Sequence, residues 1–408
     1  MEFKKATLEN GLVVVGEVNR AAKSAAVGFF VRTGSRDESG EINGVSHFLE
    51  HMLFKGTERL SAQAVNEGFD RRGAQFNAFT SEENTVFYAA VLPEYLVEVT
   101  ELWGELMRPA LRDEDFAIEK NVIKEEIAMY KDLPGFDVME RCRGLYFGGH
   151  PCGNSVLGSE ESIEGLTAGQ MRGYFERRYA PNNMVLACAG NFDWEQVVRI
   201  AEERCGGWRA QDAGREVGQV GGSGKKERSE KGNLVREHIC LMSPGVAAQD
   251  ERRHAASLLA SIVGDDVGSR YFWGLVDKAL AEAATMQFGA MDGTGAFVSY
   301  ISCSSENVAK VRDIVGGIFE DLASKGVSEN ELRKAKNKVV SALVIKNELP
   351  MGRLIDLGFN WVYLGRYRAV EEDISAVRAV TVEDMGLVIE QFDPRGFTEF
   401  ILGPSGGG

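Results

Sequence analysis

Two histidines and a glutamate stand close together in the run His47-Phe48-Leu49-Glu50-His51. On a helix, residues four positions apart share a face, so His47 and His51 can offer imidazole nitrogens to one metal ion. Glu50 lies three positions after His47 and borders the same stripe. Two imidazoles with a neighbouring carboxylate are what a catalytic zinc ion requires. The motif therefore predicts a zinc-binding helix, and the alternative is a pair of unrelated histidines on a surface helix.

A second group of candidate residues lies in the stretch 113–131, for which the sequence predicts a helix. Glu119 and Glu126 fall on one stripe of this helix together with Ile123 and Tyr130. Two acids on a partly apolar stripe are costly to bury unless a cation or hydrogen-bond donors meet them. As a third ligand Glu126 would complete a zinc site, and Glu119 would orient a ligand or the attacking water. The alternative is that both are solvated acids on an exposed helix.

These groups together indicate hydrolysis of peptide bonds. Zinc would lower the pKa of a water molecule and polarise the substrate carbonyl, while Glu50 would carry the proton from the water to the leaving amine. A purely structural zinc fits less well, because structural sites normally use four protein ligands, often cysteines. The six cysteines of the chain are scattered without a Cys-x-x-Cys pair, and we expect them to be reduced and mostly buried.

The elements that must position these residues repeat along the chain. In the first half we expect strands over 25–33 and 183–189, extended chain over 76–91, and helices over 45–55, 61–73, 93–107, 113–133 and 167–179. A similar order follows the glycine-rich stretch 206–232, with strands over 239–242 and 296–303 and helices over 253–262, 308–323 and 329–348. The sequence therefore predicts an α+β fold of two homologous domains, each a mostly antiparallel sheet with helices packed on one face. The expected division is a zinc-binding catalytic domain at 1–205, a linker at 206–232 and a homologous inactive domain at 233–408.

Composition limits the class of partner. The chain has 408 residues and a formal net charge of −15, which argues against nucleic acid or an anionic membrane as a partner. The sequence contains no apolar run of 18 residues and no apolar signal core at its start. We therefore expect a cytoplasmic protein.

The motifs resemble those of the inverted-zincin peptidases, the family of pitrilysin, insulysin and mitochondrial processing peptidase. Supporting stretches are Gly44-Val45-Ser46, Phe54-Lys55-Gly56-Thr57 and Asn77-Ala78-Phe79-Thr80. The resemblance implies a peptidase that encloses its substrate in a chamber. It also implies that Zn²⁺ is bound by His47, His51 and Glu126, with Glu50 as the general base and Glu119 supporting the ligands. By the same resemblance Asn77 and Ala78 would lie on an edge strand to which a peptide substrate adds as a further strand.

The chain departs from the family pattern in its second half. The stretch that matches the zinc helix reads His254-Ala255-Ala256-Ser257-Leu258, so we expect one zinc site per chain. Members of the family usually carry an Arg and a Tyr that hold the substrate carbonyl, but the corresponding stretch 278–283 has neither. Loss of such donors typically costs roughly 100-fold in rate. We therefore hypothesise a dimer in which a related, zinc-less subunit supplies the missing pair; the alternative is a homodimer in which Arg270 or Tyr271 replaces it.

Two functions remain after these considerations. One is a zinc-dependent endopeptidase that acts on short or unfolded polypeptides. The other is a non-catalytic core or scaffold subunit, a role that relatives of this fold fill in respiratory complexes. Scaffold relatives tend to lose the zinc ligands, whereas this chain keeps His47, His51, Glu126 and the base Glu50. The sequence therefore favours the peptidase.

Overall fold

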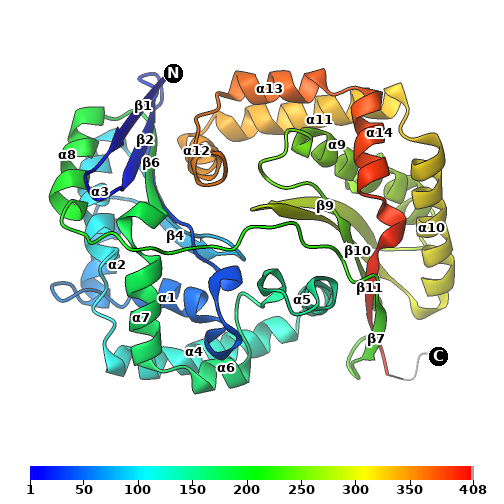
Figure 1. Cartoon of the computed structure of the whole chain (residues 1–408), viewed down its shortest axis with the longest axis horizontal. Coiled ribbons are helices and arrows are strands. Elements are labelled where there is room, and N and C mark those ends of the chain that lie inside the picture. The colour runs from blue at the N-terminus through cyan, green and yellow to red at the C-terminus, as the bar shows by residue number, and fades with distance from the viewer. Residues whose placement is uncertain (406–408) are drawn as a thin grey trace. The chain divides into compact units, whose positions relative to one another are not determined.

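The structure, a computed structural model, describes residues 1–405, and these form two compact units with one β-sheet each (Figure 1). Unit 1 comprises Met1–Ile127, Asn154–Glu216 and Val344–Ala369. Unit 2 comprises Ala128–Gly153, Val217–Leu343 and the chain from Val370 onward. The predicted α+β fold class, with two domains of mostly antiparallel sheet and helices, is confirmed.

The sheet of unit 1 has six strands in the order β1-β2-β6-β3-β5-β4. Neighbouring strands run antiparallel except β2 and β6, which are parallel. Every residue of β3 and β6 is buried, which requires cover on both faces of the sheet. The strands are β1 (Glu2–Thr7), β2 (Val13–Val18), β3 (Ala25–Val31), β4 (Gln75–Thr80), β5 (Thr85–Val91) and β6 (Met184–Gly190).

Helices cover both faces of this sheet. Helices α3 (Leu96–Leu106) and α8 (Trp194–Cys205) pack on one face, where Gly16 lies against the ring of Trp194. Helix α12 (Pro350–Leu364) packs on the other, and a Cβ atom on its Gly358 would come within 2.2 Å of the Phe30 ring, so glycine permits the close approach. The remaining helices of unit 1 are α1 (Val45–Leu53), α2 (Ala62–Asp70), α6 (Glu160–Gly165), α7 (Ala168–Arg178) and all but the end of α4 (Asp113–Lys131).

A buried ion pair fixes α12 against the sheet. The guanidinium of Arg353 on α12 donates to both carboxylate oxygens of Glu17 on β2, at 2.8 and 2.5 Å. The hydroxyl of Tyr367 donates to the same carboxylate at 2.6 Å. Both charged side chains are almost fully buried, so each depends on the other for its partner.

The sheet of unit 2 has five strands in the order β7-β11-β8-β10-β9, antiparallel except for the β7–β11 pair. Helix α5 (Pro134–Phe147) packs on one face, and a second core on the other face joins the sheet to α9, α10, α11 and α14. The strands are β7 (Lys226–Glu230), β8 (Glu237–Pro244), β9 (Ala283–Met291), β10 (Thr294–Cys303) and β11 (Thr398–Gly403). The helices are α9 (Arg253–Gly264), α10 (Val308–Lys325), α11 (Glu329–Asn347), α13 (Val370–Ala379) and α14 (Val382–Gln391).

The internal duplication includes two helices that the sequence analysis does not predict, α5 and α12. Helices α4 and α11 both have 19 residues, and each is followed by a Leu-Pro pair that begins the next helix, α5 or α12. Helix α5 lies in unit 2, although it comes from the first half of the chain, and α12 lies in unit 1, although it comes from the second. Each sheet therefore carries the predicted helical layer on one face and one further helix on the other.

The expected linker differs in part from the structure. Residues 226–230 form strand β7, which pairs in parallel with β11 at the edge of the unit 2 sheet. The strand reads Lys-Glu-Arg-Ser-Glu and has no apolar alternation, because it lies at an exposed edge. The division at 1–205, 206–232 and 233–408 refers to homologous halves and stays a prediction.

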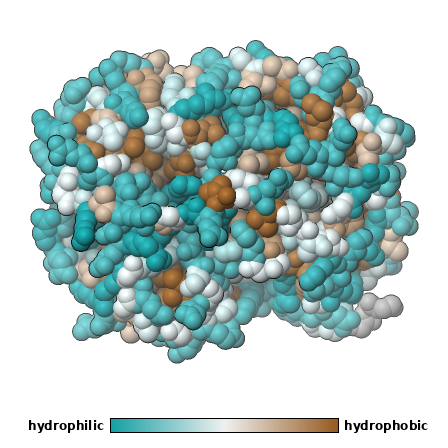
Figure 2. Space-filling view, in the orientation of Figure 1, coloured by the Kyte–Doolittle hydropathy of each residue, from teal (hydrophilic) through white to brown (hydrophobic). Residues whose placement is uncertain are grey.

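The apolarity of the helices and of one face of the surface can be described. No helix in the described part of the chain is both long enough and apolar enough to cross a bilayer. The face seen in Figure 2 is largely hydrophilic, with apolar residues scattered among polar ones.

Candidate metal centre

Helix α1 carries both candidate histidines. It begins after Gly44, whose φ of 93° suits glycine, and buries Val45, Phe48, Leu49, Met52 and Leu53. His47 and His51 lie one turn apart, with ring centroids separated by 4.7 Å. The i, i+4 spacing therefore places the two imidazoles side by side, as the sequence predicts.

Helix α4 brings the third candidate ligand to the same place. The Oε2 atom of Glu126 lies 3.7 Å from Nε2 of His47 and 3.4 Å from Nε2 of His51. One ligand atom from each of the three residues lies within 4.8 Å of the others. Two helices far apart in the sequence thus present two imidazole nitrogens and one carboxylate oxygen to a common point.

Glu119, one of the predicted supporting residues, holds His51 from behind. Its Oε1 lies 2.8 Å from Nδ1 of His51, which leaves Nε2 of the imidazole directed at Glu126. The ammonium of Lys55 contacts the other oxygen of Glu119. Burial raises the pKa of Glu119, but the hydrogen bonds from His51 and Lys55 outweigh it and lower the pKa below its usual value. Glu119 therefore stays ionised and orients the ring.

Glu50 lies beside this cluster and is held by the edge strand. The Thr80 hydroxyl donates to Oε2 of Glu50 at 2.5 Å, which links α1 to the end of β4. Burial raises the pKa of Glu50, with the neighbouring Glu126 carboxylate raising it further, while Thr80 and His51 act in the opposite direction. A carboxyl whose pKa is raised toward neutrality can both accept and release a proton.

The donor set fits a zinc ion. Burial, followed by the neighbouring His51, lowers the pKa of His47 to about 3, so its imidazole is neutral and offers a lone pair. Burial raises the pKa of Glu126, and the nearby Glu119 raises it further, while His51 acts in the opposite direction. Burial lowers the pKa of His51, yet its hydrogen bond to Glu119 and the nearby carboxylates of Glu126 and Glu50 raise it overall. Two imidazoles and one carboxylate are a catalytic zinc set, which leaves a fourth position for a substrate or water.

The two predicted substrate residues, Asn77 and Ala78, lie on β4 and do not belong to the cluster of His47, His51 and Glu126. This strand is at the edge of the unit 1 sheet. Asn77 is exposed and Ala78 is buried. The side-chain oxygen of Asn77 accepts a hydrogen bond of 2.9 Å from the backbone N–H of Ala78.

A buried carboxylate that the sequence pattern does not reveal supports the start of α1. Glu38 accepts hydrogen bonds from the backbone N–H of Gly44 and of Ser46, both at 2.7 Å, and from the Asn43 side chain at 2.9 Å. A negative charge suits a helix N-terminus. Burial raises the pKa of Glu38 to about 7 despite these donors. Glu38 lies six and eight positions before the N–H groups of Gly44 and Ser46 that it accepts from. No sequence pattern predicts this contact, because it depends on how the loop between them folds.

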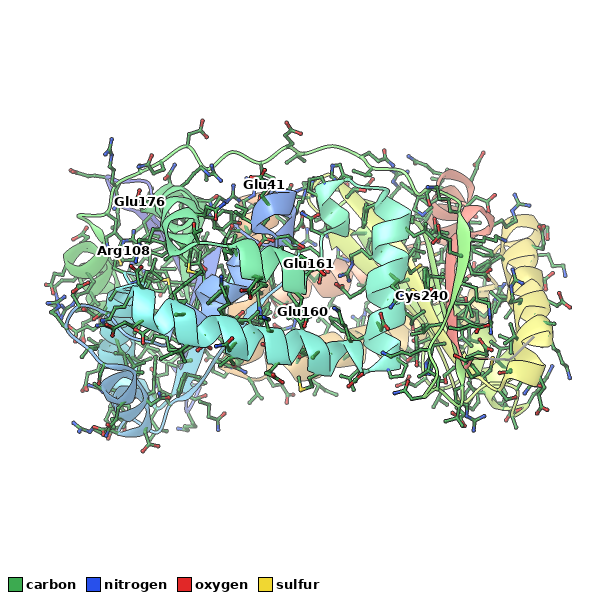
Figure 3. The ribbon with its side chains drawn as sticks, turned by 90° about the horizontal axis from the view of Figure 1, so that it is seen from below. Glu41, Arg108, Glu160, Glu161, Glu176 and Cys240 are labelled. Carbon is green, nitrogen blue, oxygen red and sulfur yellow. The ribbon has the colours of Figure 1, made fainter. Side chains whose placement is uncertain are left out.

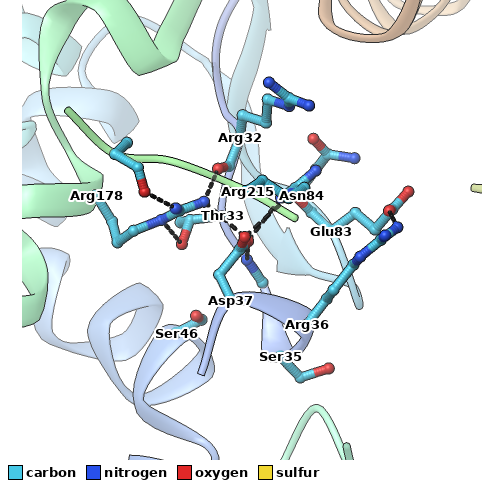
Figure 4. Close-up of polar contacts among 12 residues, drawn as sticks. Arg32, Thr33, Ser35, Arg36, Asp37, Ser46, Glu83, Asn84, Arg178 and Arg215 are labelled. Carbon is cyan, nitrogen blue, oxygen red and sulfur yellow. Dashed lines mark hydrogen bonds and ion pairs between the residues drawn. The ribbon is translucent and has the colours of Figure 1, made fainter. Parts of the chain in front are cut away.

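Further buried polar groups lie at the start of α1. The Ser46 hydroxyl contacts the hydroxyl of Tyr174 at 2.8 Å, and that hydroxyl contacts Thr33 at 2.8 Å. Arg178 donates to Thr33 at 3.1 Å (Figure 4) and pairs with the buried side chain of Asp37 at 2.8 Å. The network therefore connects the N-terminal end of α1 to the segment that follows strand β3 and to helix α7.

In unit 2, the two residues considered as replacements for the missing donors are engaged elsewhere. The side chain of Tyr271 is fully buried, with its hydroxyl 2.9 Å from Ser299. Arg270 donates to both carboxylate oxygens of Glu331, at 2.8 and 3.2 Å. As placed here, neither side chain is available to hold a substrate carbonyl.

Comparison with known proteins agrees with this geometry. Residues 13–160 match the family described as insulinase (peptidase family M16), and residues 165–339 match the peptidase M16 inactive domain. The chain is 31% identical to a protein of Bacillus subtilis named as an uncharacterized zinc protease, over 99% of both chains. Two solved structures share the fold. A protease from Helicobacter pylori has a TM-score of 0.90 at 21% identity, with 99% of this chain and 100% of that chain covered. A chain of complex III2 from Candida albicans has a TM-score of 0.85 at 20% identity, with 98% and 95% covered.

We predict that Glu38→Ala lowers the free energy of unfolding by about 1–3 kcal/mol, because it leaves buried N–H groups of Gly44 and Ser46 without an acceptor. The measurement is urea unfolding followed by circular dichroism. Glu41→Ala is the matched control: Glu41, labelled in Figure 3, is an exposed acid in the same segment, and its loss should change stability by about 0.5 kcal/mol or less. Equal effects of the two substitutions would contradict the supporting role of Glu38.

Proposed function

The chain belongs to the insulinase-like peptidase family M16, and from this premise we propose that it is a zinc-dependent endopeptidase that hydrolyses short or unfolded polypeptides. The observation that carries the proposal is the convergence of His47, His51 and Glu126 within 4.8 Å, with Glu50 beside them. A scaffold protein would have no need to keep these three donors together.

The residues would divide the chemistry as follows. Zinc held by His47, His51 and Glu126 would supply Lewis acidity toward a water molecule and the scissile carbonyl. Glu50 would accept the proton from that water and deliver it to the leaving amine, a role that its raised pKa supports. Glu119 would keep His51 in the orientation that directs Nε2 at the ion.

The edge strand β4 would align the substrate. An extended peptide can add to a free sheet edge through main-chain hydrogen bonds. Asn77 and Ala78 lie on this edge, and the N–H of Ala78, now bonded to the Asn77 side chain, would be a donor to the incoming strand. Thr80 on the same strand contacts Glu50, so a peptide paired with β4 would run past the general base.

We further propose that full activity requires a dimer with a related, zinc-less subunit, enclosing the substrate in a chamber. The basis is the absence of Arg and Tyr from residues 278–283, together with the engagement of Arg270 by Glu331 and of Tyr271 by Ser299. A hydrogen-bond donor that stabilises the tetrahedral intermediate must then come from outside residues 278–283.

We predict that Glu50→Gln lowers kcat by about 100-fold or more and leaves the zinc content unchanged, because the amide cannot carry the proton. Glu126→Gln should lose zinc together with activity. The checks are elemental analysis and hydrolysis of a quenched fluorescent peptide library. Glu125→Gln, an exposed acid next to Glu126, is the control that should change neither. Unaltered hydrolysis by the Glu50→Gln protein would refute the assigned base.

For the partner, we predict that the zinc-loaded single chain cleaves the peptide library roughly 100-fold more slowly than the complex recovered from its native lysate. Both preparations are assayed at equal zinc content. Rates that agree within a factor of about three would remove the need for a second subunit while leaving the peptidase assignment intact. Absence of zinc and of activity from both would instead support a scaffold.

A further inference from the structure

A concave site in unit 2 is separate from the metal centre and has a different chemistry. It lies where the end of α9 and the following loop meet the end of α10 and the start of α11. Its volume is about 760 Å³, which is in the range of pockets that hold small organic ligands. Ile262, Ile318 and Ala335 give it an apolar lining.

An aromatic side chain stands at this site with much of its surface open. Trp273 lies on the π-helical turn Phe272–Val276 and is 56% exposed. Its indole contacts the ring of Phe272, with ring centroids 4.9 Å apart and 80° between the ring planes, so its orientation is supported by its neighbour. π-Helical turns are rare and often occur at functional sites. An indole that is more than half exposed beside a hollow offers a surface on which a flat ring can stack.

Basic residues surround the indole. Four cationic side chains and two acidic ones line the site, although the whole chain carries a net charge of −15. The four cations are Arg270, Lys325, Lys334 and Lys338, and the two acids are Asp321 and Glu331. The site is therefore a local positive region on an acidic protein, which favours an anion.

Ion pairs hold the walls of the site in place. Arg270 donates to Glu331 and to the carbonyl oxygen of Gly326, which ties the loop after α9 to the start of α11. Lys338 pairs with Asp265 at 2.8 Å and ties the same loop to the middle of α11. A site whose walls are already fixed loses less entropy on binding.

Lys325 pairs with Asp321 at 2.8 Å, so one of the four cations remains for a ligand. Lys334 lies on the face of α11 between these two anchored positions, is exposed, and has no ion-pair partner within the described residues. Its ammonium is free to meet an anionic group, while the ring of the same ligand stacks on Trp273.

We propose that this site binds a small anion that bears an aromatic ring, of the class of nucleoside phosphates. Trp273 stacks with the base and Lys334 pairs with the phosphate, while the ion pairs of Arg270 and Lys338 hold the walls of the site. The inference is independent of the proposed peptidase activity, because none of these residues belongs to the metal centre.

The test is calorimetric titration of the zinc-loaded full chain with ADP in the absence of other divalent ions. Adenosine and inorganic pyrophosphate, titrated separately, should each bind at least tenfold more weakly than ADP. Trp273→Ala and Lys334→Glu should each weaken ADP binding about tenfold or more. Lys310→Glu, an exposed lysine on α10 that does not line the site, is the control and should leave the affinity unchanged.

Three results would overturn the proposal, and a fourth would contradict the stacking contact. The first is no heat of binding at millimolar ADP. The second is ADP affinity that survives both Trp273→Ala and Lys334→Glu, since the anion would then be bound elsewhere. The third is loss of ADP binding in the Glu126→Gln protein, because the phosphate would then be a ligand of the metal centre. If pyrophosphate bound as tightly as ADP, stacking of the base on Trp273 would contribute nothing to the affinity. That result would contradict the proposed role of Trp273.

Discussion

Three ligand atoms within 4.8 Å of one another, on side chains that are largely withdrawn from water, impose the central constraint on unit 1. Imidazoles and carboxylates crowded in this way carry shifted pKa values unless a cation balances them. The surrounding structure holds them in place from two sides. Glu38 anchors the start of α1, and Glu119 with Lys55 fixes the ring of His51. Rigid support of this kind would keep the proposed ligands oriented for an ion.

The local pattern was enough to identify the residues of the candidate site. The i, i+4 spacing of His47 and His51 places both on one helical face whatever the tertiary fold. The acidic stripe of the stretch 113–131 indicates a helix whose carboxylates need a cation or hydrogen-bond donors. The structure brings His47, His51 and Glu126 together. It also places Glu119 behind His51 and Glu50 beside the cluster. The roles of these residues in catalysis, and of Asn77 and Ala78 in binding, stay proposals.

What the sequence could not predict depends on contacts between distant segments. Helical periodicity identifies an apolar face but does not say which sheet it covers, so the placement of α5 in unit 2 and of α12 in unit 1 was not foreseen. Strand β7 lacks an apolar alternation because it lies at an exposed edge. Thr80 and Glu38 have ordinary sequence surroundings, and only the folded chain brings them to Glu50 and to the start of α1.

The measurement that tests the account most directly is the zinc K-edge X-ray absorption spectrum of the purified chain, with elemental analysis of the same sample. We predict one zinc ion per chain, with nitrogen and oxygen neighbours at about 2.0–2.2 Å and an imidazole signature. The same spectrum should disappear in the Glu126→Gln protein. Zinc bound through sulfur at about 2.3 Å, or no zinc in protein prepared without chelators, would contradict the assignment of His47, His51 and Glu126.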